Sequence, residues 1–200
     1  MRYAVAESGA YLAYVSIYDT SKVQKESIGT ILGTSTELLD FDFMNLELIV
    51  VGKTDMKEVS ALVDMYSKRI NHYAKFSITY LPDLRNTKNL SEQQQKIAEG
   101  EMLLKDITTG DYVVLLDEAG EEMRSVAFAQ WMQKRMNSGV RRLVLMIGGP
   151  YGFSEAVYAR ANGKLSLSKM TFSHQIVRAI FTEQLYRAFT IIKGEPYHHE

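Results

Sequence analysis

The sequence contains no cysteine and only four histidines, and both shortages limit the chemistry that it can carry. Without cysteine the chain forms no disulfide, holds no thiolate zinc site and has no cysteine nucleophile. Three of the histidines lie at or near the C-terminal end, which leaves little for a metal cage, and we expect no metal site. Any chemistry must therefore come from oxygen and nitrogen groups or from a bound cofactor.

Long apolar runs are also absent from the sequence. No stretch approaches the roughly 18 uninterrupted apolar residues that a membrane-spanning helix needs. The N-terminus has no basic region followed by an apolar core and a small-residue cleavage site. The chain has 200 residues, 46% apolar and 24% charged, a composition typical of a globular protein. We therefore expect a cytoplasmic protein with no membrane partner.

The net charge of -1 hides an uneven distribution of charge. Residues 1–43 hold three basic and six acidic side chains, whereas residues 160–193 hold six basic side chains and only one acidic one. A local basic surface of this kind attracts phosphate, although a run of charge is as often only a solvated face. The basic residues are Arg160, Lys164, Lys169, Arg178, Arg187 and Lys193.

From residue 46 onward, segments with strand-like and helix-like patterns alternate. The polar stretch 83–95 is expected to be a mobile loop that leads into a helix ending near Ile107. The alternation predicts an α/β fold with a parallel-rich sheet and helices on both of its faces. The predicted strands cover 46–51, 76–81, 112–116 and 143–147, and the predicted helices cover 56–70, 125–137, a short segment opened by Ser154, and 174–192.

Residues 1–43 do not follow this scheme, because they show no clear hydrophobic period. Met44 follows them directly and stands just before the first strong strand pattern. Two interpretations remain open. Either Met44 is the natural start and residues 1–43 belong to an over-extended reading frame, or these residues form an extra element peculiar to this chain. The expected domain covers residues 44–200.

Two segments have the composition to hold a ligand beyond the carboxyl ends of the strands, where ligands bind in such sheets. Residues 148–152, Gly-Gly-Pro-Tyr-Gly, follow a strand and precede a helix, so the backbone can approach a ligand closely and the helix N-terminus favours an anionic group. Taken alone, a glycine turn of this kind is more often only a turn. Residues 165–171, Leu-Ser-Leu-Ser-Lys-Met-Thr, could wrap a polar ligand or form a short amphipathic strand.

Polar residues on the last predicted helix form a second group of candidates. His174 and Arg178 stand four residues apart and therefore share a helix face, and a histidine can serve as a general base. Glu183 and Arg187 are also four apart, and we favour a surface ion pair over catalysis for them. The tail over residues 194–200 is too short to pack alone, so we expect it to act only when docked onto another surface, such as a second subunit.

These elements, in this order, resemble the RlmH family, the pseudouridine N3-methyltransferases of large-subunit ribosomal RNA within the SPOUT class. The resemblance covers residues 44–200, and the final forty residues are its most specific part. The matching segments are Val51-Gly52-Lys53, Leu116-Asp117 with Gly120, Ile147-Gly148-Gly149-Pro150-Tyr151-Gly152, Leu165-Ser166-Leu167-Ser168-Lys169-Met170-Thr171, His174 with Arg178, Glu183-Gln184-Leu185-Tyr186-Arg187-Ala188 and Pro196-Tyr197-His198.

The resemblance implies a fold and a cofactor that periodicity could not reveal. SPOUT enzymes have a trefoil knot in the C-terminal part, act as homodimers in which the partner subunit completes each active site, and bind S-adenosylmethionine in the knot. The family offers no counterpart to residues 1–43. By this analogy the cofactor would contact Leu116, Gly148, Gly149, Leu167, Ser168, Lys169, Met170, Thr171 and Phe172.

The reaction that the resemblance implies is methyl transfer to N3 of a pseudouridine in 23S ribosomal RNA of the assembled ribosome, with no DNA partner. Arg178 or Arg187 could hold phosphate or the negative charge that develops on the base. We expect Arg178 and the Tyr197-His198 tail to engage RNA, with His174 close to the target base. The groups that could accept the proton or orient the base are His174, Glu183, Tyr197 and His198.

Two alternatives remain open at this point. The first keeps the knot and the cofactor but changes the acceptor to another RNA base, because nothing in the residues themselves names pseudouridine. The second is a non-catalytic ribosome-binding factor on the same scaffold. The intact glycine turn and residues 165–171 count against the second alternative, because a binding module has no need for a cofactor slot.

Overall fold

The computed structural model describes residues 3–5, 11–13 and 44–198. The chain divides into two units, Met1–Phe41 and Asp42–Glu200. In the first unit, strands β1 (Tyr3–Val5) and β2 (Tyr11–Ala13) pair antiparallel. Both interpretations of residues 1–43 stay predictions.

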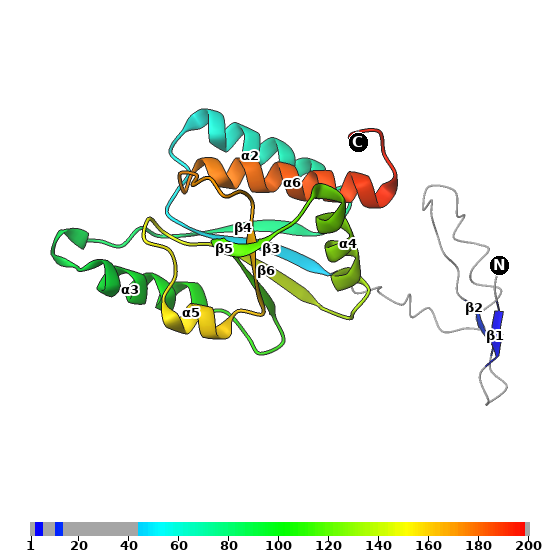
Figure 1. The fold of residues 1–200 in the computed structure, drawn as a ribbon, viewed down its shortest axis with the longest axis horizontal. Helices are drawn as coiled ribbons and strands as arrows, with labels where there is room; N and C mark the ends of the chain where they lie inside the picture. Colours follow the sequence, from blue (N-terminus) through cyan, green and yellow to red (C-terminus); the bar gives the residue numbers. More distant parts are fainter. Residues whose placement is uncertain (1–2, 6–10, 14–43, 199–200) are drawn as a thin grey trace, which may run out of the picture. The chain divides into compact units, whose positions relative to one another are not determined.

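The second unit is built on one five-stranded sheet whose strand order is β4-β3-β6-β5-β7 (Figure 1). Every neighbouring pair of strands in this sheet is parallel, which confirms the α/β fold predicted from the alternating pattern. The strands are β3 (Asn45–Val51), β4 (Phe76–Leu81), β5 (Tyr112–Glu122), β6 (Arg142–Ile147) and β7 (Gly163–Ser166).

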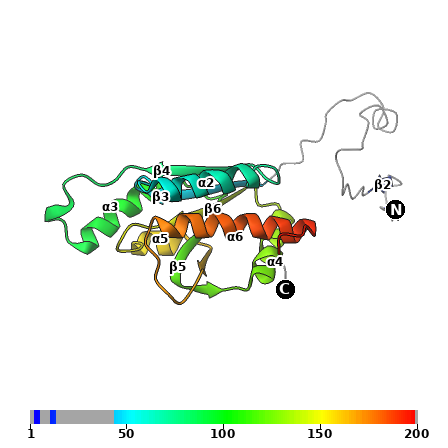
Figure 2. The ribbon, with the colours of Figure 1, turned by 90° about the horizontal axis from the view of Figure 1, so that it is seen from above.

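Helices cover both faces of the sheet, as predicted. Alternate residues of a strand point to opposite faces, so Leu48 packs with α2, α4 and α6 on one side and Ile49 packs with α3 and α5 on the other. Figures 1 and 2 show α6 running beside α2, against which it packs. The helices are α2 (Lys57–Ile70), α3 (Glu92–Leu104), α4 (Ser125–Met136), α5 (Glu155–Arg160) and α6 (Ile176–Lys193).

The polar stretch 83–95 differs from its prediction as a loop. A short 3-10 helix, η2 (Thr87–Asn89), interrupts it, and α3 begins at Glu92. The side chain of Ser91 accepts a hydrogen bond from the Gln94 backbone N–H at 3.2 Å, and the Gln94 side chain accepts one from the Ser91 backbone N–H at 2.8 Å. This reciprocal capping box satisfies two backbone donors at the helix start, so the glutamine run is helical.

Strand β5 is longer than predicted and contains an irregularity that matters for the site. Leu165 of β7 lies opposite both Leu116 and Glu121 of β5, so residues 117–120 bulge out of the ladder. At Gly120 a Cβ atom would come within 2.6 Å of the Leu165 backbone, far closer than a side chain tolerates. Glycine at position 120 therefore allows the strand to return to β7 after the bulge.

The trefoil knot, which the family resemblance implies for the C-terminal part of the chain around β7 and α6, stays a prediction. Among the residues that the structure describes, no helix is both long and apolar enough to cross a membrane.

Candidate functional site

A cavity of about 700 Å³ opens at the end of β6 and at the bulge of β5, next to Leu116 and Gly148, where the sequence predicted a ligand. Its walls come from the bulge within β5, the glycine turn after β6 and the segment between β7 and α6. Every residue predicted to contact a cofactor lines this cavity, with the exception of Lys169, which is exposed. His174, at the entrance to α6, lines it as well.

The glycine turn forms one wall because its backbone packs too tightly to leave space for side chains. A Cβ atom on Gly148 would lie 3.1 Å from the carbonyl oxygen of Gly152, and Gly152 itself has a φ of +82°. Gly149 and Gly152 form an isolated antiparallel bridge that closes the turn. The backbone of Gly148 and Gly149 is thereby presented to the cavity, as an extended ligand would require.

Polar groups on the bulge within β5 form another part of the cavity wall. Asp117 accepts hydrogen bonds from the Tyr158 hydroxyl at 2.6 Å and from the Ala119 backbone N–H at 2.8 Å. Burial raises the pKa of Tyr158 to about 12, and donation to Asp117 adds to the effect. The hydroxyl therefore stays protonated at neutral pH and holds the bulge against α5.

The segment between β7 and α6 is shaped by its own hydroxyl groups. The Ser166 hydroxyl donates to the Ser168 carbonyl at 3.0 Å, and the Met170 backbone N–H donates to the Ser168 hydroxyl at 2.9 Å. The Met170 side chain is 72% exposed, which makes it the most exposed large apolar group among the described residues. These local bonds turn the chain around the cavity and leave an apolar side chain at its mouth.

Arg178 is not on the surface, although the sequence suggested contact with RNA. Its side chain is only 1% exposed. The guanidinium donates to the carbonyl oxygens of Val51 at 2.6 Å, Gly52 at 3.0 Å and His174 at 3.0 Å, and to the Thr54 hydroxyl at 2.8 Å. Arg178 therefore joins the end of β3 to the start of α6, a positioning role that leaves no face open to phosphate.

Glu183, Arg187 and Tyr197 form a cluster farther along α6. Glu183 and Arg187 form the intrahelical ion pair that the sequence favoured, and the Tyr197 hydroxyl donates to Glu183 at 3.1 Å. The Arg187 guanidinium lies 4.8 Å from the centroid of the Tyr197 ring. Burial raises the pKa of Tyr197, and its contact with the Tyr66 hydroxyl adds to the rise. The tail thus lies against α6 and α2 of its own chain.

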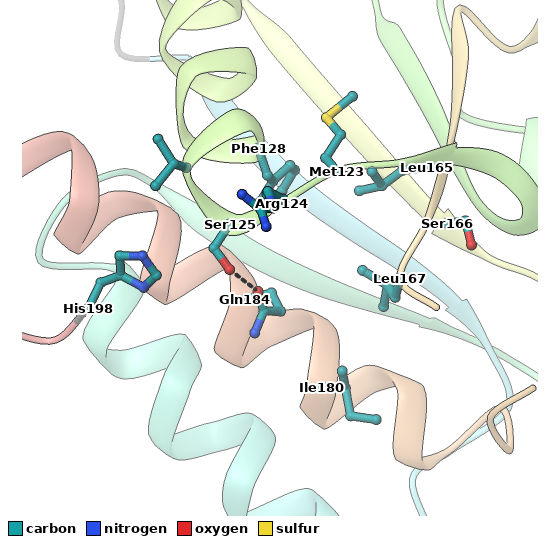
Figure 3. A pocket seen from close by; sticks show the side chains of 11 residues that line it. Met123, Arg124, Ser125, Phe128, Leu165, Ser166, Leu167, Ile180, Gln184 and His198 are labelled. Carbon is teal, nitrogen blue, oxygen red and sulfur yellow. Dashed lines mark hydrogen bonds between the residues drawn. The ribbon is translucent and has the colours of Figure 1, made fainter. Parts of the chain in front are cut away.

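His198 lines a second cavity of about 750 Å³ (Figure 3). Both of its ring nitrogens are buried and have no hydrogen-bond partner among the described residues. Across this cavity the Ser125 hydroxyl lies 3.3 Å from the Gln184 side-chain oxygen, the hydrogen bond drawn in Figure 3. Residues 165–167 line both cavities, so this segment forms a wall between them.

His174 and the Tyr197-His198 tail lie at opposite ends of one helix, α6. His174 stands just before α6, and Tyr197 and His198 follow its end. A helix rises about 1.5 Å per residue, so the 18 residues of α6 place its two ends roughly 27 Å apart. A single chain therefore does not bring His174 together with the tail.

Three of the six basic side chains over residues 160–193 have local partners, so the phosphate-binding interpretation of this segment loses half of its candidates. Arg178 is buried, Arg187 is paired with Glu183, and the Arg160 guanidinium donates to the carbonyls of Thr108 and Asp111. These guanidinium groups donate hydrogen bonds to nearby acceptors, because arginine carries five N–H donors. The exposed basic side chains that remain are Lys164, Lys169 and Lys193.

Sequence reasoning missed Glu99, on the buried side of α3. Its side chain is only 2% exposed, and it packs directly against Gly149 of the glycine turn. Burial raises its pKa. An acidic residue in a polar helical segment is usually a surface residue, so only the adjacent Gly100, which packs against Ser154, signalled that this face of the helix is covered.

The comparisons with known proteins agree on one family. The family described as "Predicted SPOUT methyltransferase" matches residues 44–198. The chain is 60% identical over 156 residues to the ribosomal RNA large subunit methyltransferase H of Christiangramia forsetii, an alignment that covers 78% of this chain and 99% of the relative. It is 56% identical over 157 residues to the protein of the same name from Flavobacterium johnsoniae, which covers 78% of this chain and 100% of the relative.

A solved structure of a probable methyltransferase from Bordetella pertussis Tohama I aligns with a TM-score of 0.44 and 10% identity, covering 74% of this chain and 96% of that one. The family match spans well over half of the chain, and the relatives are covered over nearly their whole length. The cavity between the β5 bulge and the glycine turn after β6 lies within the matched residues. The chain therefore belongs to the SPOUT methyltransferases, in the family of ribosomal RNA large subunit methyltransferase H.

Proposed function

We propose that this chain transfers a methyl group from S-adenosylmethionine to N3 of a pseudouridine in 23S ribosomal RNA, acting on the assembled ribosome in the cytoplasm. The observation that carries the proposal is the cavity between the β5 bulge and the glycine turn, lined by eight of the nine residues that the family resemblance assigns to the cofactor. The relatives' names supply the substrate class.

The residues around the cavity fit S-adenosylmethionine. Leu116, Leu167 and Phe172 can enclose an adenine ring, and the backbone of the glycine turn offers donors and acceptors without side chains in the way. A volume of about 700 Å³ lies within the usual range for pockets that hold small molecules. Exposed Met170 at the mouth could close over a bound ligand.

The bound donor supplies a methyl group on a positively charged sulfur, which a nitrogen nucleophile displaces. The protein has to place the base in line with that methyl group, and positioning of this kind can account for much of a rate enhancement. Residues 165–167 separate the cofactor cavity from the cavity of Figure 3. We assign the target base to the neighbourhood of this wall, with His174 on the cofactor side.

The proton on N3 must leave before or during transfer. His174 is exposed at the cofactor cavity, and His198 has two ring nitrogens without partners among the described residues. Either imidazole can accept a proton or orient the base. Glu183 already accepts from Arg187, Gln184 and Tyr197, which suits it to hold the tail and makes it a weaker candidate for the base.

We further propose that the protein works as a homodimer. The length of α6 keeps His174 away from the tail of the same chain. A symmetric dimer brings the tail of one subunit to the cofactor cavity of the other if the two α6 helices run past each other. Sedimentation should then give twice the mass of one chain.

The test is transfer of labelled methyl groups to ribosomes that lack the modification, with free ribosomal RNA in parallel. The full chain and a version that starts at Met44 are compared, so the same assay reports the effect of residues 1–43. Label that maps to a pseudouridine of the large subunit is the expected result. Binding of S-adenosylmethionine without transfer to ribosomes would indicate a different RNA acceptor, and absence of binding would contradict the proposal.

A further inference from the structure

Lys96 brings a positive charge into the cofactor cavity without a partner of its own. It is half-buried on α3 and is the one lysine or arginine among the described residues that line this cavity. Glu92 precedes it by four residues and Glu99 follows it by three, spacings at which ion pairs form along a helix. Lys96 nevertheless forms no salt bridge or hydrogen bond within the described part of the chain. Its ammonium group is therefore free to bind a ligand.

The helix that carries Lys96 packs against the glycine turn. Glu99 lies about one turn farther along α3, and a Cβ atom added to Gly149 would collide with its carboxylate. Helix α3 also packs against α5, which begins just after the turn. Residues three apart on a helix lie on the same side of it, so Lys96 reaches the cavity beside Gly149. Its charge stands where the backbone of the turn is presented to a ligand.

The other charged and titratable groups of the cavity cannot replace Lys96 as a partner for an anion. Asp117 and Glu118 carry the opposite charge, and Asp117 already accepts two hydrogen bonds from the protein. His174 contributes an imidazole, and no permanent cation other than Lys96 is found among the described lining residues. An anionic group on a ligand in this cavity therefore has one cationic partner.

We propose that Lys96 binds the carboxylate at the amino-acid end of S-adenosylmethionine. This assignment rests on the proposed function, and it extends that function to a residue that the family resemblance did not assign to the cofactor. The carboxylate is the one anionic group of the donor molecule, which also carries an ammonium group and a positive sulfur. A lysine ammonium has three donors and no acceptor, so a carboxylate complements it. A charge-assisted hydrogen bond of this kind is about twice as strong as a neutral one.

The contact predicts which ligands the cavity prefers. S-Adenosylmethionine carries the carboxylate, whereas its decarboxylated form keeps the nucleoside, the positive sulfur and the ammonium group and lacks only the carboxylate. Comparison of the two ligands therefore separates carboxylate binding from any general effect of Lys96 on the cavity. A phosphate group of the RNA substrate is the other anion that could meet Lys96, and binding of the donor in the absence of RNA distinguishes the two.

The experiment measures the binding of S-adenosylmethionine and of its decarboxylated form by calorimetry, with the full chain and without RNA. Lys96→Met removes the charge and keeps an unbranched side chain, and Lys96→Arg keeps the charge. Lys105→Met is the matched control, because it makes the same change at the exposed C-cap of α3. Urea unfolding of each variant verifies that it folds.

We expect Lys96→Met to weaken the binding of S-adenosylmethionine by about tenfold or more and to leave the binding of the decarboxylated form unchanged. Lys105→Met should leave both affinities unchanged, and Lys96→Arg should retain most of the affinity for S-adenosylmethionine. Unaltered affinity of Lys96→Met for S-adenosylmethionine would overturn the assignment, and so would an equal loss for the decarboxylated form. If the wild-type chain bound neither molecule, the proposed function itself would fall, and the role of Lys96 with it.

Discussion

Replacement of Arg178 by alanine tests whether this arginine supports the fold or contacts RNA. The substitution removes four hydrogen bonds and leaves the buried carbonyls of Val51 and Gly52 without donors. Each buried carbonyl that loses its partner costs about 1–3 kcal/mol, and the loss of the packed aliphatic stem adds about 1 kcal/mol. We therefore expect the free energy of unfolding to fall by about 4 kcal/mol, out of roughly 5–15 kcal/mol for a domain.

The assay is urea unfolding followed by the fluorescence of Trp131, which is the only tryptophan in the sequence and packs against Phe128 of the core. Arg160→Ala serves as the control, because its guanidinium also donates to main-chain carbonyls but lies nearer the surface. We expect that control to lose about 1 kcal/mol or less. Arg178→Lys keeps the charge with fewer donors, so its stability should fall between those of the wild type and the alanine variant.

One combination of results would refute the reasoning about Arg178. If Arg178→Ala lowered the free energy of unfolding by less than about 1 kcal/mol and its affinity for ribosomes fell sharply, the guanidinium would be facing RNA. The opposite pattern is the one we expect. The variant should lose stability first, and any loss of methyl transfer should diminish at lower temperature, where the folded fraction recovers.

Three further changes test other parts of the structure. Gly120→Ala should disturb the return of β5 to β7 and weaken S-adenosylmethionine binding several-fold in calorimetry, whereas substitution at exposed Gly110 should leave binding unchanged. Ser91→Ala removes the capping box of α3 and should cost about 1 kcal/mol in urea unfolding; no change would mean that the cap is not formed in solution. Because the pKa of folded Tyr158 is raised to about 12, its contribution to stability is complete below its ordinary pKa near 10 and is lost as the pH rises toward 12. The urea midpoint of Tyr158→Phe should therefore fall less steeply than that of the wild type over this range, and parallel curves would contradict the link to Asp117.

The strands could be predicted from the sequence because their residues are apolar on both faces. Residues 48–51 and 143–147 are continuous hydrophobic runs, which is typical of strands covered by helices on both sides. The extension of β5 to Glu122 could not be predicted in this way. The second half of β5, residues 117–122, is rich in acidic residues. It bulges at residues 117–120 and pairs with β7 again at Glu121 and Glu122, so no hydrophobic period marks it.

The candidate site was predictable in its location and less so in its details. The rule that ligands bind beyond the carboxyl ends of parallel strands pointed to Leu116 and Gly148, and both line the cavity. Arg178 and Glu99 show the limit of this reasoning. A charged residue is usually exposed, and the partners that bury these two lie more than 40 residues away in the sequence, where no local pattern can indicate them. The capping box at Ser91 was a local signal that could have placed the start of α3.

The length of α6 has a consequence for genetics. In the proposed dimer each site takes His174 from one subunit and the tail from the other, so two different defective chains can complement each other. A dimer formed from a His174→Ala chain and a chain without its tail has both defects in one site and neither in the other. Co-expression of the two variants should therefore restore part of the methylation that each one lacks alone, whereas mixing two chains with the same defect should restore none.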